Sequence, residues 1–114
     1  MRDIEELSII YDLFISELKF FSSAFDTQYE NLKHTAMADE LASDFSEVET
    51  DRAEILYQND WITENHFALV KTINKTLDEM NNNNLLWSEE AVKHAKEWEE
   101  CRQLGKELLK DLGY

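Results

Sequence analysis

The three histidines are the first residues to consider for chemistry, because imidazole is a common metal ligand. His34 and His94 each follow a glutamate by four residues, a spacing that places both side chains on one face of a helix. Helical bundles that hold two metal ions instead use Glu-x-x-His, a pattern that the chain lacks. We expect no cofactor and interpret the histidines as surface or edge residues. A carboxylate metal site is the weaker alternative.

Cys101 and the carboxylates form no catalytic pattern. Cys101 lies between Glu100 and Arg102 with no histidine nearby in the sequence, and acidic neighbours disfavour the thiolate that a nucleophile needs. The chain has no glycine-rich phosphate loop and no Gly-x-Ser-x-Gly motif. Among 25 acids, carboxylate pairs at helical spacing arise by chance. We expect a protein without enzymatic activity.

The stretch from Ala38 to Glu64 has the most unusual composition of the chain. It carries nine acids against one base, Arg52, and three large aromatic residues lie among them. Carboxylates speed the encounter with a basic partner, and desolvated rings supply much of the affinity. The predicted partner-binding residues are six acids and two aromatic residues: Asp44, Glu47, Glu49, Asp51, Glu54, Tyr57, Asp60 and Trp61.

The tryptophans divide between two predicted roles. Trp87 and Trp98 lie on or next to apolar helix faces and are expected in the core. Trp61 follows Asp60 within the acidic stretch, so it is either a core residue or an anchor for the partner.

The net charge of −14 restricts the classes of partner. It disfavours nucleic acid and anionic membranes, which would be repelled at long range, and leaves basic proteins. The chain has no apolar run long enough to span a bilayer and only one cysteine, so the cytoplasm is the expected location.

Apolar periodicity predicts an all-α protein. In the first segment, residues 3–25, apolar residues recur at alternating steps of three and four, and further helices are expected at 27–43, 46–57, 63–80 and 88–112. Val48, Ala53, Leu56 and Tyr57 have the spacing that fits the short helix expected at 46–57. The chain has no proline and no alternating strand pattern. We predict one domain, residues 1–114, folded as an antiparallel bundle of four to six helices around the first helix.

Caps and breaks set the expected helix ends. Thr27 with Glu30 and Ser46 with Glu49 have capping-box spacing. Thr63 and Ser88 are expected N-caps, and residues 81–84, all asparagine, predict a loop. Gly113 is the expected end of the last helix.

The C-terminal half resembles small helical bacterial immunity proteins of toxin-immunity systems. The likeness rests on Asn59-Asp-Trp-Ile, on the segment that begins Leu85-Leu-Trp-Ser-Glu-Glu-Ala, and on a terminal helix with Trp98, Arg102, Gly105 and Leu109. The resemblance implies that the protein neutralises a cognate toxin, commonly a basic nuclease, by tight binding.

Two functional hypotheses follow. In the first, the protein is a non-catalytic inhibitor that binds a basic toxin or nuclease domain through the acidic stretch. In the second, it is a structural or regulatory helical module, with a homodimer through the phenylalanine-rich first helix as one form, and the acids serve solubility.

Overall fold

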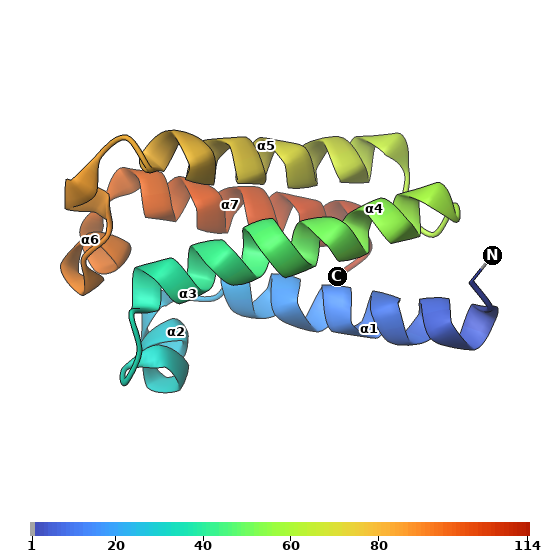
Figure 1. Ribbon diagram of the computed structural model, residues 1–114, viewed down its shortest axis with the longest axis horizontal. Coiled ribbons are helices and arrows are strands. Elements are labelled where there is room, and N and C mark those ends of the chain that lie inside the picture. Colours follow the sequence, from blue (N-terminus) through green and yellow to red (C-terminus); the bar gives the residue numbers. More distant parts are fainter. Residues whose placement is uncertain (1) are drawn as a thin grey trace.

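Four long helices form an up-down-up-down bundle in the computed structural model, which describes residues 2–114 (Figure 1). The first is α1 (Ile4–Phe21), and the second is continuous through α3 (Met37–Ser43), the π-helical segment η1 (Asp44–Glu49) and α4 (Thr50–Gln58). They are followed by α5 (Glu64–Met80) and α7 (Lys96–Asp111). Each long helix packs against two antiparallel neighbours. The all-α bundle is confirmed, and the described residues include no strand.

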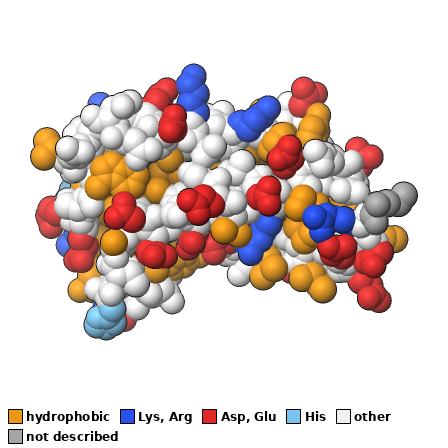
Figure 2. Space-filling view, viewed as in Figure 1, with side chains coloured by type: hydrophobic (Ala, Val, Ile, Leu, Met, Phe, Trp, Pro, Cys, Tyr) orange, Lys and Arg blue, Asp and Glu red, His pale blue; other side chains and the backbone are white. Residues whose placement is uncertain are grey.

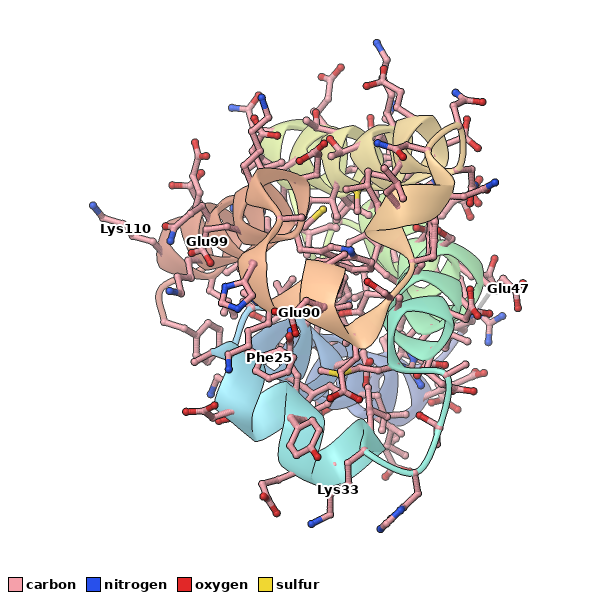
Figure 3. All side chains as sticks on the ribbon, turned by 90° about the vertical axis from the view of Figure 1, so that its left-hand side faces the viewer. Phe25, Lys33, Glu47, Glu90, Glu99 and Lys110 are labelled. Atoms are coloured by element: carbon pink, nitrogen blue, oxygen red, sulfur yellow. The ribbon has the colours of Figure 1, made fainter. Side chains whose placement is uncertain are left out.

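Three short helices cover one end of the bundle, on the left in Figure 1. They are α2 (Phe25–Leu32), the 3₁₀ turn η2 (Asn84–Leu86) and α6 (Glu89–His94). Figure 3 looks onto this end, where α6 lies above α2 and the Lys93 ammonium lies 5.8 Å from the centre of the Phe25 ring. The short helices thus close the apolar core between the long ones.

The core runs the length of the bundle and draws on every long helix. Its largest fully buried apolar side chains include Phe14, Leu18, Phe45, Leu56, Ile73 and Leu108. The Trp98 indole is also buried and donates to the Leu86 carbonyl oxygen at 2.7 Å. Trp87 is half-buried and contacts Trp98 edge to face. The predicted core position of Trp98 is confirmed, and Trp87 lies at the core boundary.

A buried arginine joins the short helices to α7. Arg102 donates from Nε and Nη2 to Gln28 Oε1, at 3.2 and 3.1 Å, and from Nη2 to the Val92 carbonyl oxygen. Gln28 in turn donates to the Phe21 carbonyl oxygen at the end of α1. A buried guanidinium is tolerated only when its donors are satisfied, and here most of them are.

Gly105 allows α7 to approach the end of α1 closely. A Cβ atom at Gly105 would lie 1.9 Å from Ser22 Oγ and 3.0 Å from Ser22 Cβ, so a larger residue would require the Ser22 side chain to move. Trp98, Arg102 and Gly105 therefore form the buried face of α7. The polar groups of Trp98 and Arg102 form hydrogen bonds within the fold.

Side-chain caps form the starts of three helices, and two of the capping residues, Thr63 and Ser88, are those that the sequence predicts. Asp3 accepts from the Glu6 N–H at the start of α1, and Ser88 accepts from Ala91 at the start of α6. Thr63 and His66 cap α5 reciprocally. At the other end of the chain, Gly113 adopts φ +98° after α7, the left-handed conformation expected of a helix stop.

Several predicted boundaries are wrong. The first break falls at residues 22–24, and α2 begins at Phe25 without the Thr27 capping box. The expected 27–43 helix is interrupted at residues 33–36, and the expected last helix is divided at Ala95, where ψ is 136°. No glycine or proline marks these breaks. Near the break at Ala95, the Val92 carbonyl oxygen accepts from Arg102.

No helix among residues 2–114 combines the length and the apolar character that crossing a membrane requires.

Candidate functional site

The central element of the candidate surface is the helix from Met37 to Gln58, here called the α3–α4 helix. Leu41, Phe45, Glu49 and Ala53 are all buried at intervals of four residues. In an α-helix, a four-residue interval would rotate successive side chains by about 40°, away from a straight line. A π-helical turn contains more residues than an α-helical turn, so the four buried side chains of this segment stay on one side of the helix. The π-helical hydrogen bond runs from the Thr50 N–H to the Phe45 carbonyl oxygen, five residues earlier. The chain therefore continues through Ser43 and Ser46, where the sequence predicted a break.

The π segment also decides which side chains face inward. Val48, one of the apolar positions of the predicted 46–57 helix, is 41% exposed, whereas Glu49 is buried. Phe45 is buried too, with its ring 4.6 Å from that of Phe21.

Five exposed carboxylates lie along the α3–α4 helix, and Figure 2 shows acidic side chains spread over this part of the surface. They are Asp39, Glu40, Glu47, Asp51 and Glu54, and we call them the acidic ridge. Glu47, Asp51 and Glu54 follow one another at steps of four and three, which places them in one row. Of the predicted partner-binding acids, the structure exposes Glu47, Asp51, Glu54 and Asp60, and half-buries Asp44.

Arg52, the one base of the acidic stretch, points toward the bundle interior instead of along the ridge. Its Nη1 lies 3.5 Å from Glu49 Oε1, within ion-pair range but without hydrogen-bond geometry, and its side chain is 25% exposed. No carboxylate of the acidic ridge forms an ion pair with this base.

Glu49 does not belong to the predicted binding surface, which corrects the prediction from the sequence. Its side chain has no exposed area, and neither carboxyl oxygen has a hydrogen-bond partner within the chain. Burial raises the pKa of the Glu49 carboxyl from 4.5 to about 9, Arg52 opposes this rise, and Glu17 adds to it. At neutral pH Glu49 is a neutral acid beneath the surface, unable to meet the basic residues of a partner.

Glu17 of α1 completes this cluster and was not singled out by the sequence. Burial and the charge of Asp44 raise the pKa of its carboxyl, whereas Arg52 lowers it. The sequence did contain an indication of this position. Glu17 is a single glutamate between Phe14 and Leu18, which are both buried, on the apolar side of α1. Glu17, Glu49 and Arg52 thus join α1 to the α3–α4 helix.

The two predicted anchors are half-buried in aromatic pairs. The Tyr57 ring stacks on Phe67 with 5.0 Å between centroids, and the Trp61 ring lies 5.8 Å from Tyr11. Both rings help to hold the bundle together and keep part of their area at the surface. Trp61 therefore lies at the core boundary, between its two predicted roles.

Asp60, at the end of α4, is exposed and adopts φ +63°. The Trp61 N–H donates to the Leu56 carbonyl oxygen and the Asp60 N–H to that of Tyr57, the two bonds of a Schellman motif. An aspartate thus occupies the left-handed position where glycine is usual.

An open groove of about 820 Å³ borders the acidic ridge on the side of α5. Asp39 and Glu47 lie on one wall, and Lys71 and Lys75 on the other. On that side the ridge faces bases of its own chain, so its free side is toward α1.

The three histidines and Cys101 lie apart from one another, at helix ends, at the surface and in the core. His66 caps α5, His34 is exposed, and His94 lies 3.1 Å from Glu90. Within residues 2–114, no group of three or more histidine, cysteine or acidic side chains is placed to hold a metal ion. Cys101 is buried, and burial raises the pKa of its thiol to about 12, which disfavours a thiolate.

Comparisons with protein-family models, with curated proteins and with solved structures give no match for this chain.

Proposed function

We propose that the protein is a non-catalytic inhibitor that neutralises a basic toxin, such as a nuclease, by binding it through the acidic ridge. The observation that carries this proposal is the row formed by Glu47, Asp51 and Glu54 on the outer side of one helix. The resemblance of the C-terminal half to immunity proteins agrees with it.

The electrostatics of the ridge suit fast recognition of a cationic surface. Carboxylates of one sign in a row attract a basic partner over about 10 Å at moderate salt. Arg52 is directed toward Glu49, and no carboxylate of the acidic ridge lies within ion-pair distance of it. Asp60 and the exposed parts of Tyr57 and Trp61 lie beyond the C-terminal end of the row and would extend the contact.

The experiment compares three forms of the protein. The ridge variant carries Glu47→Gln, Asp51→Asn and Glu54→Gln. The control variant carries Glu79→Gln, Glu89→Gln and Glu100→Gln, three exposed acids on other helices. Both variants lose three negative charges, so they separate the position of the charges from their total. Partners are captured from a lysate of the native host at low salt, released at high salt and identified.

A basic polypeptide should be retained by the wild type and by the control. Its association rate with the ridge variant should fall about tenfold or more at low ionic strength, because steering depends on local charge. The purified polypeptide should also lose its toxic or nuclease activity when one equivalent of the wild-type protein is added. Equal association rates for the ridge and control variants would reject the proposed surface. Binding without loss of activity would reject the inhibitory role.

The alternative of a homodimer through the first helix is less well supported. Phe14 and Phe21 are buried inside the bundle, and Phe20 and Phe25 are half-buried. Two copies, each with a net charge of −14, would also repel one another.

A further inference from the structure

The feature from which this inference starts is the open groove of about 820 Å³ between the α3–α4 helix and α5. Ala42 and Leu77, both buried, contribute apolar side chains to its floor. The half-buried Trp87 adds an aromatic ring at the end nearest the short helices. Sites for small molecules are enclosed and mostly apolar. An open groove with charged walls suits a segment of another protein better.

The charges of the groove are ordered along its length. On α5, Lys71 and Lys75 lie one turn apart, and Asp78 follows them toward the short helices. The α3–α4 helix runs antiparallel to α5 (Figure 1), so Glu47 lies toward the lysine end of the groove and Asp39 toward the Asp78 end. One end of the groove is therefore acidic on both walls, and the other end has lysines on the α5 wall.

The charged side chains of the groove do not pair with one another. The ion pairs within residues 2–114 all join residues three or four positions apart in the chain, so none of them crosses the groove. The Lys71 ammonium lies 4.8 Å from the centre of the Phe67 ring instead of against a carboxylate. These charges are therefore free to pair with opposite charges of a partner.

We propose that this groove receives a helix of the partner protein that carries both signs of charge, with acidic side chains toward Lys71 and Lys75 and basic side chains toward Asp39 and Asp78. The inference deepens the proposed function and rests on it. A groove between two antiparallel helices fits a third helix, which packs on both at axis distances of about 8–10 Å. The α5 wall from Lys71 to Asn81 spans about 15 Å, the length of about three helical turns.

The two lysines make the groove selective among basic proteins. The net charge of −14 attracts any basic protein at long range. A uniformly basic surface is repelled at Lys71 and Lys75, whereas a partner with acids at this place forms ion pairs with both. The groove therefore separates the cognate partner from other cationic proteins.

The test uses two synthetic helical peptides labelled for fluorescence anisotropy. The mixed peptide carries glutamates one turn apart near one end, lysines near the other end and alanines elsewhere. The basic peptide has glutamine in place of each glutamate, so it is the more positive of the two. The lysine variant of the protein carries Lys71→Gln and Lys75→Gln. The α7 control carries Lys106→Gln and Lys110→Gln, two exposed lysines with the same spacing on another helix. Circular dichroism verifies that both variants fold.

The wild type and the α7 control should bind the mixed peptide about fivefold more tightly than the basic peptide, although long-range attraction favours the basic one. The lysine variant should lose this preference or reverse it. A wild type that prefers the basic peptide, an equal loss of preference in the lysine variant and the α7 control, an unchanged preference in the lysine variant, or no saturable binding of the mixed peptide would each overturn the inference. A wild type that sediments as a dimer, with a monomeric lysine variant, would assign the groove to a second copy and overturn it too.

The ridge variant distinguishes failure of this inference from failure of the proposed function. If the basic polypeptide captured from the lysate depends on the ridge charges and the wild type prefers the basic peptide, the helix inference alone fails. If the wild type prefers the mixed peptide through Lys71 and Lys75, and the captured polypeptide associates with the ridge variant as fast as with the wild type, the groove binds a helix and the proposed electrostatic function fails.

Discussion

Glu49 shows how a single residue can be misjudged from sequence. In the sequence it is one acid among nine, and its neighbour Val48 has the better claim to the core. In the structure the two exchange places, and Glu49 has no exposed area and no hydrogen-bond partner within the chain. A buried neutral acid of this kind costs stability, because the folded protein must retain a proton that the unfolded chain releases.

The pH dependence of stability should report this proton. The pKa of Glu49 is about 9 in the folded state and about 4.5 in the unfolded state. The stability contributed by the protonated carboxyl is therefore complete below pH 4.5 and is lost as the pH rises toward 9. One such group changes the free energy of unfolding by at most about 1.4 kcal/mol per pH unit. Glu49→Gln cannot ionise, so it should flatten the decline and be the more stable form at pH 8.

Urea denaturation between pH 5 and pH 8 measures this difference. Glu54→Gln removes an exposed acid of the same helix and is the control, expected to keep the wild-type slope. Parallel curves for Glu49→Gln and the wild type would mean that Glu49 is ionised in the fold.

The helix elements divide into those set by local sequence and those set by packing. The starts of α1 and α5 were predictable because Asp3 and Thr63 provide side-chain caps and a regular apolar stripe follows each of them. The π segment was not predicted, because Glu49, one of the buried positions four residues apart from Leu41 to Ala53, is an acid and interrupts the apolar pattern. Of the predicted binding residues, the exposed acids could be found from charge alone, whereas the burial of Glu49 depends on the rotation of the helix within the bundle.

The backbone conformation of Asp60, after the end of α4, is unfavourable for a residue with a side chain, and substitution by glycine should relieve it. Asp60 occupies the left-handed position of the Schellman motif at φ +63°. Asp60→Gly should raise the free energy of unfolding by about 0.5–1 kcal/mol, because glycine has no Cβ to clash in this conformation. Urea denaturation measures the change, seen as a higher midpoint at an unchanged slope.

Gln58→Gly is the matched control for this substitution. Gln58 is the last residue of α4 and exposed, so glycine there should lower stability. Loss of stability in both variants would show that the Asp60 side chain makes a favourable interaction. If Asp60 contacts the partner as proposed, Asp60→Gly should also bind more weakly while it folds more stably.

At the scale of the whole molecule, the dominant property is the net charge of −14 on a body with extents of 42 × 25 × 23 Å. Much of this charge lies on exposed carboxylates of the α3–α4 helix and of α1. Like charges at these separations repel one another, and the unfolded chain relieves the repulsion.

Sodium chloride should therefore stabilise the protein. Raising it from about 10 mM to about 100 mM shortens the screening length from about 30 Å to about 10 Å. The melting temperature should rise by several degrees, since about 1 kcal/mol corresponds to roughly 4–8 °C in a domain near this size. Thermal unfolding followed by circular dichroism measures the shift, and the ridge variant, with three fewer charges, should show a smaller one. A melting temperature that falls with added salt would mean that attractive ion pairs outweigh the repulsion.

The hydrogen bonds between Arg102 and Gln28 join residues 74 positions apart, which has a consequence for the order of folding. The helices that this arginine contacts, α2 and α6, have eight and six residues and are too short to persist alone in water. They can be stable only after α7, the last helix of the chain, has docked on the others. During synthesis α2 must therefore wait for the C-terminal residues, and in the folded protein its backbone amides should exchange with solvent before those of the long helices.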